Sequence, residues 1–216
     1  MNKTTRTPRK SISARDRVSA AARALFVKNG YEGVSIDEIA RKARVSKPTL
    51  YAHFGSKERL FLTILEEAFD RIAAPLLRDE VEGVAIEDVF DSHAKAYARA
   101  VLNPDMLAFN RLLIGEAVRF PEMAHQYYES GPAAAYAAVA EFLEKRVKSG
   151  EIGCKDCLAA ARMYGAMIIS PHRLRLQLLV DDAPNWDEID RQTSLAVQIF
   201  VAGLKTLAAG PARALS

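Results

Sequence analysis

The chain has 216 residues, of which 50% are hydrophobic and 26% are charged, with two cysteines and a formal net charge of +3. This length allows one large or two small domains with a sizeable core, and the low Gly and Pro content with helical spacing of Ala and Leu predicts an all-α fold. Two cysteines and no signal-like apolar start argue against a secreted disulfide scaffold and predict a protein of the reducing cytoplasm. The longest late uncharged run, Gln192 to Leu204, is too short to span a bilayer, so we expect no membrane partner.

The charge is unevenly divided along the chain. Residues 1–60 hold 14 Lys and Arg against 5 Asp and Glu, whereas the other 156 residues hold 16 against 22. A basic first quarter on an acidic body predicts a nucleic-acid-binding head and a sensing or partner-binding body. Residues 1–11 form a basic tail without periodicity, which we expect to be flexible and either to enter a minor groove or only to aid solubility.

The segment after this tail predicts a helix-turn-helix domain over residues 12–56. A first helix is expected at 13–28, and Ser35 with Glu38 forms a capping box for a helix at 36–43. Ser46 caps a third helix at 47–54, in which Pro48 lies in the first turn, where its missing N–H costs little. A short helix, a tight turn and a short basic helix are typical of DNA-binding heads.

Three stretches of this segment carry a family resemblance. They are Phe26, Gly30, Tyr31 and Ser35; Val45, Ser46, Leu50, Tyr51 and Phe54; and Lys57, Glu58 and Leu60. On these residues the first quarter of the chain resembles the DNA-binding domain of the TetR family of bacterial transcriptional regulators. Arg44 and Pro48 depart from the pattern, because the family often has Gly at both places. Arg44 is expected to need a left-handed backbone, while its charge suits the helix end and a nearby phosphate.

The resemblance and side-chain chemistry together predict the DNA contacts. The expected DNA-binding residues are Ser35, Arg44, Ser46, Lys47, Thr49, Tyr51, His53 and Lys57. Lys47 and Thr49 are the candidates for base edges, since recognition helices enter the major groove by their N-terminal end. The others are expected to contact phosphates, although Tyr51 could instead be a half-buried packing residue. Because one head reads few bases, we expect a homodimer on a palindromic double-stranded operator.

Residues 57–210 are predicted to form a helical ligand-binding and dimerisation domain. A fourth helix should run from 57 to near Pro75, followed by a loop at 78–84. Further helices are expected at 86–102, 105–120 (capped by Asn103), 122–129, 132–148, 156–169, 172–179 and 187–208. Pro171 should break or kink the chain between two of them, and Asp187 should cap the last helix. In the family the last two long helices pair across the two-fold axis as a four-helix bundle; alternatively, they only complete the monomer's core.

The middle of the body is similar to the AefR-like subgroup of this family. The matching residues are 111–117, 119–122 and 128–132. The resemblance implies a cavity for a small-molecule effector, mostly apolar with a few polar groups. The candidate ligand-binding residues are Tyr97, Phe109, Asn110, Leu113, Met123, Tyr127, Met163 and Met167, although each of them could be an ordinary core residue.

Other functions find little support in the sequence. No phosphate-binding Gly loop, catalytic motif or metal-ligand spacing is present, so we expect no enzyme activity, no metal and no cofactor. We therefore predict a ligand-responsive transcriptional repressor released from its operator by a small molecule. Three alternatives stay open: redox control through Cys154 and Cys157, a constitutive DNA-binding protein without an effector, and a small-molecule-binding protein with a vestigial head.

Overall fold

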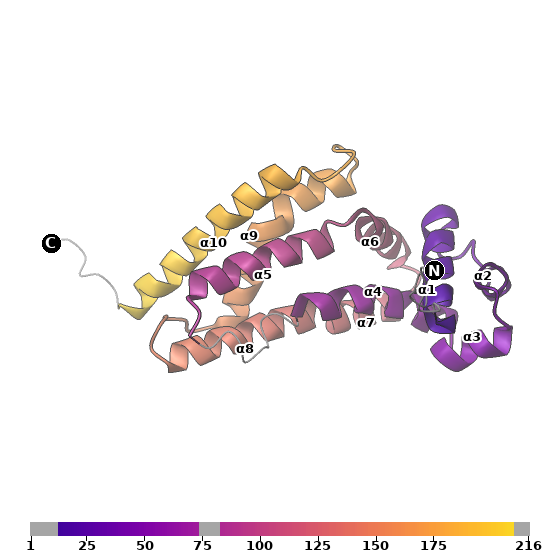
Figure 1. Ribbon diagram of the computed structural model, residues 1–216, viewed down its shortest axis with the longest axis horizontal. Coiled ribbons are helices and arrows are strands. Elements are labelled where there is room, and N and C mark those ends of the chain that lie inside the picture. Colours follow the sequence, from indigo (N-terminus) through magenta and orange to yellow (C-terminus); the bar gives the residue numbers. More distant parts are fainter. Residues whose placement is uncertain (1–12, 74–82, 210–216) are drawn as a thin grey trace, which may run out of the picture. The chain divides into compact units, whose positions relative to one another are not determined.

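The computed structural model describes residues 13–73 and 83–209, without the side chains of residues 65 and 67–73 (Figure 1). All regular structure within these ranges is helical, which confirms the predicted all-α fold. The chain divides into two compact units, Met1–Ile64 and Leu65–Ser216. This division falls within the fourth helix, whereas the sequence analysis placed the domain boundary at that helix's start. The predicted tail at 1–11 lies outside the described residues, as do most of the predicted loop at 78–84 and the predicted helix end near Pro75.

The first unit is built around a cluster of aromatic side chains. It contains α1 (Ala14–Asn29), α2 (Ile36–Ala43), α3 (Lys47–Phe54) and the first turns of α4 (Lys57–Ala73). The ring of Phe61 meets those of Phe26 and Tyr31 edge-on, with centroids 5.4 and 5.2 Å apart. Leu50 and Phe54 bury one side of α3, which leaves the opposite side of that helix to solvent.

The second unit contains the remaining helices. They are α5 (Ile86–Val101), α6 (Pro104–Glu116), α7 (Pro121–Tyr128), the π-helical turn η2 (Glu129–Ala133), α8 (Ala134–Lys148), α9 (Cys157–Gln177) and α10 (Trp186–Ala208). Its core lies where α5, α8, α9 and α10 meet. Phe90 of α5 is fully buried there and makes edge-on contacts with Phe142, Tyr164 and Phe200, at centroid distances of 5.5, 4.7 and 5.5 Å.

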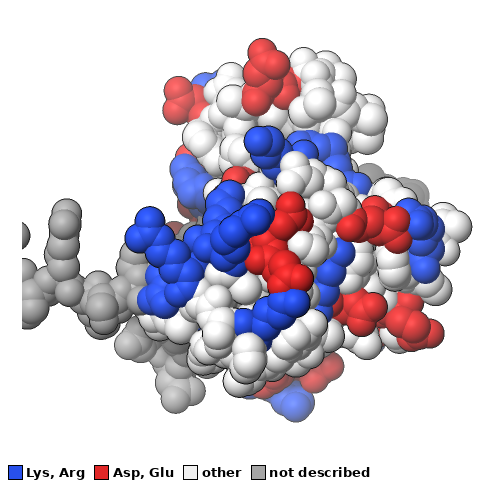
Figure 2. All heavy atoms as spheres, turned by 90° about the vertical axis from the view of Figure 1, so that its right-hand side faces the viewer, with Lys and Arg blue, Asp and Glu red and all other residues white. Residues whose placement is uncertain are grey.

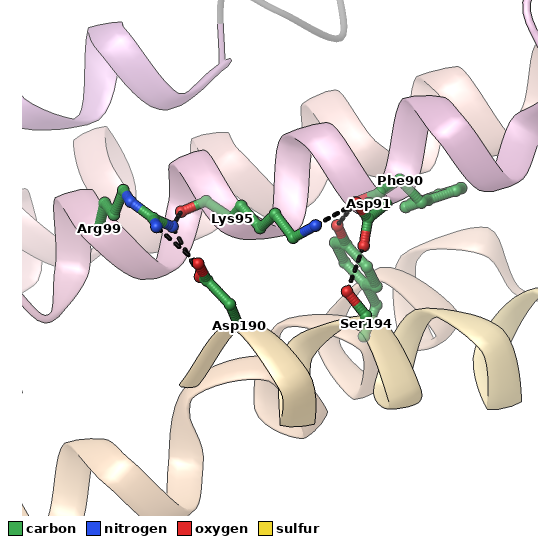
Figure 3. Close-up of polar contacts among 7 residues, drawn as sticks. Phe90, Asp91, Lys95, Arg99, Asp190 and Ser194 are labelled. Carbon is green, nitrogen blue, oxygen red and sulfur yellow. Dashed lines mark hydrogen bonds and ion pairs between the residues drawn. The ribbon is translucent and has the colours of Figure 1, made fainter. Parts of the chain in front are cut away.

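Polar contacts fasten α5 to α10 along one side of this core (Figure 3). Arg99 donates two hydrogen bonds of 2.7 Å to the Asp190 carboxylate, and this pairing lowers the pKa of Asp190. Ser194 donates a 2.6 Å hydrogen bond to Asp91, whose other oxygen accepts from Lys95. A two-pronged Arg–carboxylate pair also constrains orientation, so these contacts set how the two helices align.

Four expectations about the second unit need correction. The helices predicted at 156–169 and 172–179 are one helix, α9, which runs through Pro171 without a break and keeps Ile168, Ile169 and His172 buried. The cap of α10 is Asn185, whose side chain accepts from the Glu188 N–H at 3.3 Å, rather than Asp187.

The other two corrections concern the chain around Pro121 and Pro132. Helix α6 ends at Glu116 instead of Phe120. Residues 117–119 form turns, and Phe120, which precedes Pro121, adopts φ −127° and ψ 64°, outside the helical region. The expected break between α7 and α8 is instead the continuous π-helical turn η2, which contains Pro132.

Candidate nucleic-acid interface and interior polar cluster

Two capped helix ends fix the path of the turn between α2 and α3. Ser35 accepts from the Glu38 N–H at 3.2 Å while the Glu38 carboxylate accepts from the Ser35 N–H at 2.9 Å, the reciprocal pairing expected of a capping box. This hydrogen bonding lowers the pKa of Glu38, which keeps the carboxylate charged. At the other end of the turn, Ser46 accepts from the Thr49 N–H at 3.2 Å and caps α3.

Arg44 makes the reversal between these caps. Its backbone has φ 54° and ψ 51°, the left-handed conformation predicted from the sequence. The next N–H, that of Val45, reaches back to the Ala40 carbonyl at 3.0 Å, which closes the end of α2. The Arg44 side chain is left exposed at the turn.

The predicted DNA contacts gather on the exposed side of this motif. Ser35, Arg44, Ser46, Lys47, Tyr51 and His53 are exposed, and Thr49 and Lys57 are partly buried. Tyr51 is 48% exposed, so its ring projects to solvent more than a packing residue's would. Lys47 forms a 2.5 Å ion pair with Asp37, and Lys57 places its ammonium 4.5 Å from the centre of the Tyr31 ring. Each cation therefore already has one partner within the head, a carboxylate for Lys47 and an aromatic ring for Lys57.

Positive charge is concentrated at the same place. Arg41, Lys42, Arg44 and Lys47 are all exposed, and no acidic residue lies among residues 41–47. Figure 2 faces the side that carries α2 and α3 and shows Lys and Arg side chains next to several groups of Asp and Glu. Such a surface attracts the phosphate backbone of a nucleic acid.

The second unit brings three of the eight candidate ligand residues together with others that the sequence analysis missed. Tyr127 donates a 2.5 Å hydrogen bond to the buried Asn110 amide oxygen. The Tyr97 phenol interacts with those of Tyr136 and Tyr127, and the positive charge of Arg173 works against the rise in pKa of both Tyr97 and Tyr127. We call these five side chains, Tyr97, Asn110, Tyr127, Tyr136 and Arg173, the interior polar cluster.

Burial keeps the phenols of this cluster protonated. It raises the pKa of Tyr127 to about 12 and that of Tyr97 further still. Beside them, the ring of His93 stacks on that of Tyr97, and its Nδ1 lies 2.8 Å from the Tyr164 hydroxyl. Burial lowers the pKa of His93 to about 4, so this histidine is neutral near pH 7.

The other predicted ligand residues are divided between two places. Phe109, Leu113 and Met123 are buried. Met163 is 64% exposed, and with Met167 it lines an apolar groove of about 680 Å³ between α9 and α10, away from the interior polar cluster. Leu195, Ile199 and Leu207 are also more than half exposed on α10. We call the exposed apolar side chains of α9 and α10 the α9–α10 face.

Cys154 and Cys157 lie next to each other at the start of α9. Both are free and partly buried, and Cys154 lines the end of the groove. Burial is the larger cause, and a hydrogen bond with Cys154 the next, of a pKa of Cys157 that is raised to about 11. A thiol with a raised pKa holds little thiolate at neutral pH and therefore reacts slowly.

Among the residues that the structure describes, no group of three or more His, Cys, Asp or Glu side chains is arranged to hold a metal ion. Within the same residues, no helix combines the length and the apolar character needed to cross a membrane.

A capped helix-turn-helix on a basic surface, joined to a larger helical unit, defines a DNA-binding transcriptional regulator. Comparison with known proteins agrees: residues 19–64 match the model of the bacterial regulatory proteins of the tetR family, and residues 88–203 match the AefR-like transcriptional repressor C-terminal domain. The chain belongs to the TetR family, and it is a transcriptional regulator and not an enzyme.

Individual relatives extend this similarity to most of the chain. The HTH-type transcriptional repressor SCO4008 of Streptomyces coelicolor is 32% identical over 173 residues, covering 77% of this chain and 84% of its own. A TetR-family regulator from Mesorhizobium loti shares the fold with a TM-score of 0.77 at 27% identity, covering 88% of this chain and 95% of the other. The flavonoid-responsive regulator FrrA superposes with a TM-score of 0.70 at 28% identity and the same two coverages.

Proposed function

We propose that the protein is a ligand-responsive repressor that binds a palindromic operator as a homodimer and leaves it when a small molecule binds the second unit. The observation that carries this proposal is the geometry of the α2–α3 turn. It presents the exposed N-terminal end of α3, with Lys47 and Thr49, beside a row of cations. Recognition helices read base edges from that end, and the surrounding cations supply phosphate contacts.

Dimerisation through α9 and α10 would explain the α9–α10 face. Met163, Leu195, Ile199 and Leu207 each expose more than half of their surface, which is unusual for large apolar side chains on one side of a monomer. Gly203 has no atom within 4 Å of the position of a Cβ, so a partner helix can approach closely at that point. Two copies of this face would bury each other's apolar side chains about a two-fold axis, and the two heads would then address two half-sites.

A small molecule as the releasing signal fits the interior polar cluster. Tyrosine hydroxyls and a guanidinium contribute little to the stability of an apolar core, but they can orient a bound ligand. The similar regulator FrrA is described as flavonoid-responsive, which supports a small aromatic effector here.

The test is fluorescence anisotropy of the purified protein on DNA from its own upstream region and on scrambled DNA, across a salt series. We expect tight, sequence-dependent binding whose log affinity falls linearly with log salt. Lys47→Ala should weaken operator binding by roughly 10- to 100-fold if Lys47 reads a base. Lys28→Ala, which removes the same charge from an exposed position on α1, should change it little.

Three results would contradict parts of this proposal. Weak binding with equal affinity for both DNAs would contradict operator recognition. A Lys47→Ala variant with wild-type affinity for the operator would contradict a DNA contact by Lys47. A monomer at micromolar concentration would remove the two-fold arrangement. An operator complex that no small molecule releases would instead favour the constitutive alternative, and release by an oxidant that Cys154→Ser abolishes would favour redox control.

A further inference from the structure

The interior polar cluster is assembled from five helices, each of which supplies one polar side chain. Tyr97 comes from α5, Asn110 from α6, Tyr127 from α7, Tyr136 from α8 and Arg173 from α9. Tyr127 donates a 2.5 Å hydrogen bond to Asn110, and the Tyr97 and Tyr136 hydroxyls hydrogen-bond each other. Polar groups in a core are costly to bury unless each is paired, and two donors beside this cluster on α9 are not paired.

Two donors on α9 are left without acceptors. The Nε of Arg173 and the amide nitrogen of Gln177 are both buried, and neither has a hydrogen-bond partner among the described residues. The two positions are four residues apart, so their side chains lie on the same side of the helix. A ligand that binds both must supply acceptor oxygens.

The charges that face the cluster have one sign. Arg173 is the charged side chain that acts on the phenols of both Tyr97 and Tyr127, and the other groups acting on them are tyrosines and an amide. The phenols stay protonated because of their burial, so they add no negative charge beside Arg173, and Tyr127 already donates its proton to Asn110. Arg173 is partly buried, and its Nε is buried without an acceptor, so this guanidinium favours an anion and repels a cation.

The Tyr97 and Tyr136 side of the cluster is tightly packed. A cavity lined by His93, Tyr97, Tyr136, Tyr164 and Gly165 has room of only about 10 Å³, that of a single water molecule. Its tightness shows at Gly165, where a Cβ would lie 2.9 Å from the Tyr136 ring and 3.8 Å from the Tyr97 hydroxyl. Ligand sites typically enclose roughly 300–1,000 Å³, so a ligand that enters this cavity must push the aromatic rings apart and then lie among them.

We propose that the effector is a small aromatic acid, whose carboxylate is bound by Arg173 and Gln177 and whose ring lies among Tyr97, Tyr127 and Tyr136. This assignment rests on the proposed function, because it names the chemistry of the same effector site. The carboxylate supplies the acceptors that Arg173 and Gln177 lack. The aromatic body replaces the ring-to-ring contacts that it displaces.

The test compares acids with their neutral isosteres on the full-length protein. Isothermal titration and thermal shift would measure 2-naphthoate, cinnamate and 4-phenylbenzoate against the corresponding primary amides. The variants are Arg173→Met, Arg173→Lys and, as a matched control, Arg162→Met, which removes an exposed arginine from the same helix. We expect at least one acid to bind tenfold or more tightly than its amide, with roughly 10- to 100-fold lost in Arg173→Met and nothing lost in Arg162→Met.

Arg173→Lys keeps the charge but loses the planar guanidinium, so it should retain part of the preference for acids. This variant replaces Arg173→Met in the binding test if Arg173→Met does not fold. Amides that bind as tightly as acids, an Arg173→Met protein that still prefers acids, or no binding by any acid at millimolar concentration would each overturn the inference. Operator release is measured separately. Acids that bind through Arg173 without releasing DNA would refute the effector part of the proposed function and leave this site intact. If only neutral or cationic compounds release the protein from DNA, the aromatic-acid site is refuted and the proposed ligand-responsive function is kept.

Discussion

Arg44 allows the stability of the head and its affinity for DNA to be changed in opposite directions. It is one of two non-glycine residues with positive φ in the described chain, and its side chain is exposed on the basic surface. Arg44→Gly removes both the backbone strain and the charge. Arg44→Ala removes the charge and keeps the strain, so the pair separates the two effects.

The magnitudes follow from the local geometry. A non-glycine residue at φ 54° and ψ 51° costs roughly 1–2 kcal/mol, which glycine does not pay. Glycine adds about 0.5–1 kcal/mol of backbone entropy to the unfolded chain. Arg44→Gly should therefore stabilise the first unit by about 0.5–1 kcal/mol, whereas Arg44→Ala should leave it within about 0.5 kcal/mol of the wild type. If Arg44 contacts one phosphate in each head of the proposed dimer, the salt slope should fall by about 2 in both variants.

Amide hydrogen exchange of the buried amides in α1, α2 and α3 measures the stability of the first unit without interference from the second. Anisotropy on the operator across a salt series measures the slope. Arg44→Asn is a further control, because asparagine tolerates the left-handed region without the flexibility of glycine. If the first unit has the same free energy of unfolding in Arg44→Gly and Arg44→Ala, backbone strain at this turn does not contribute significantly to stability. If Arg44→Gly keeps the wild-type salt slope, Arg44 does not contact phosphate.

Further predictions concern both units. Because the pKa of His93 is about 4 when folded and near 6.5 when unfolded, stability present above pH 6.5 should fall as the pH drops towards 4, by on the order of 3 kcal/mol. Urea unfolding of His93→Gln, which can still hydrogen-bond Tyr164, should show a flatter profile between pH 5 and 6.5, and an unchanged profile would contradict the assignment. Gly153→Ala should cost about 2–3 kcal/mol or more by urea unfolding, since its Cβ would lie 2.4 Å from the backbone of α10; a neutral result would refute that contact. Asp37→Asn should tighten DNA binding up to about fivefold by freeing Lys47, and the gain should vanish in the Lys47→Ala background.

The head could be predicted from the sequence in detail because its decisive interactions are local. The Ser35–Glu38 capping box joins residues three apart, and so does the hydrogen bond from the Thr49 N–H to Ser46. The left-handed Arg44 follows from a helix that must end just before the next cap. Such contacts depend on residue types at fixed short spacing, which a sequence displays directly.

The interior polar cluster was only partly predictable, because it depends on how distant helices pack. Tyr97, Asn110 and Tyr127 were recognised as pocket residue types, but Tyr136, Arg173 and Gln177 were not. Met163 and Met167 were predicted to line the ligand pocket, but they line the groove between α9 and α10. Their spacing did not show which side of α9 faces the core, since α9 is apolar around much of its surface. The crowding of tyrosines at 97, 127, 136 and 164 was the one available signal in the sequence.

The closed interior bears on how an effector could control DNA binding. A ligand that fits a preformed cavity can bind without changing anything, and equal affinity for two conformations shifts neither. The cavity beside Tyr97 and Tyr136 holds about one water molecule, so an aromatic effector enters that cavity only if the surrounding side chains move. An effector that binds there therefore prefers a rearranged second unit. The repressor then needs only that this closed form be the one that holds the operator, in which case release follows from binding by linkage.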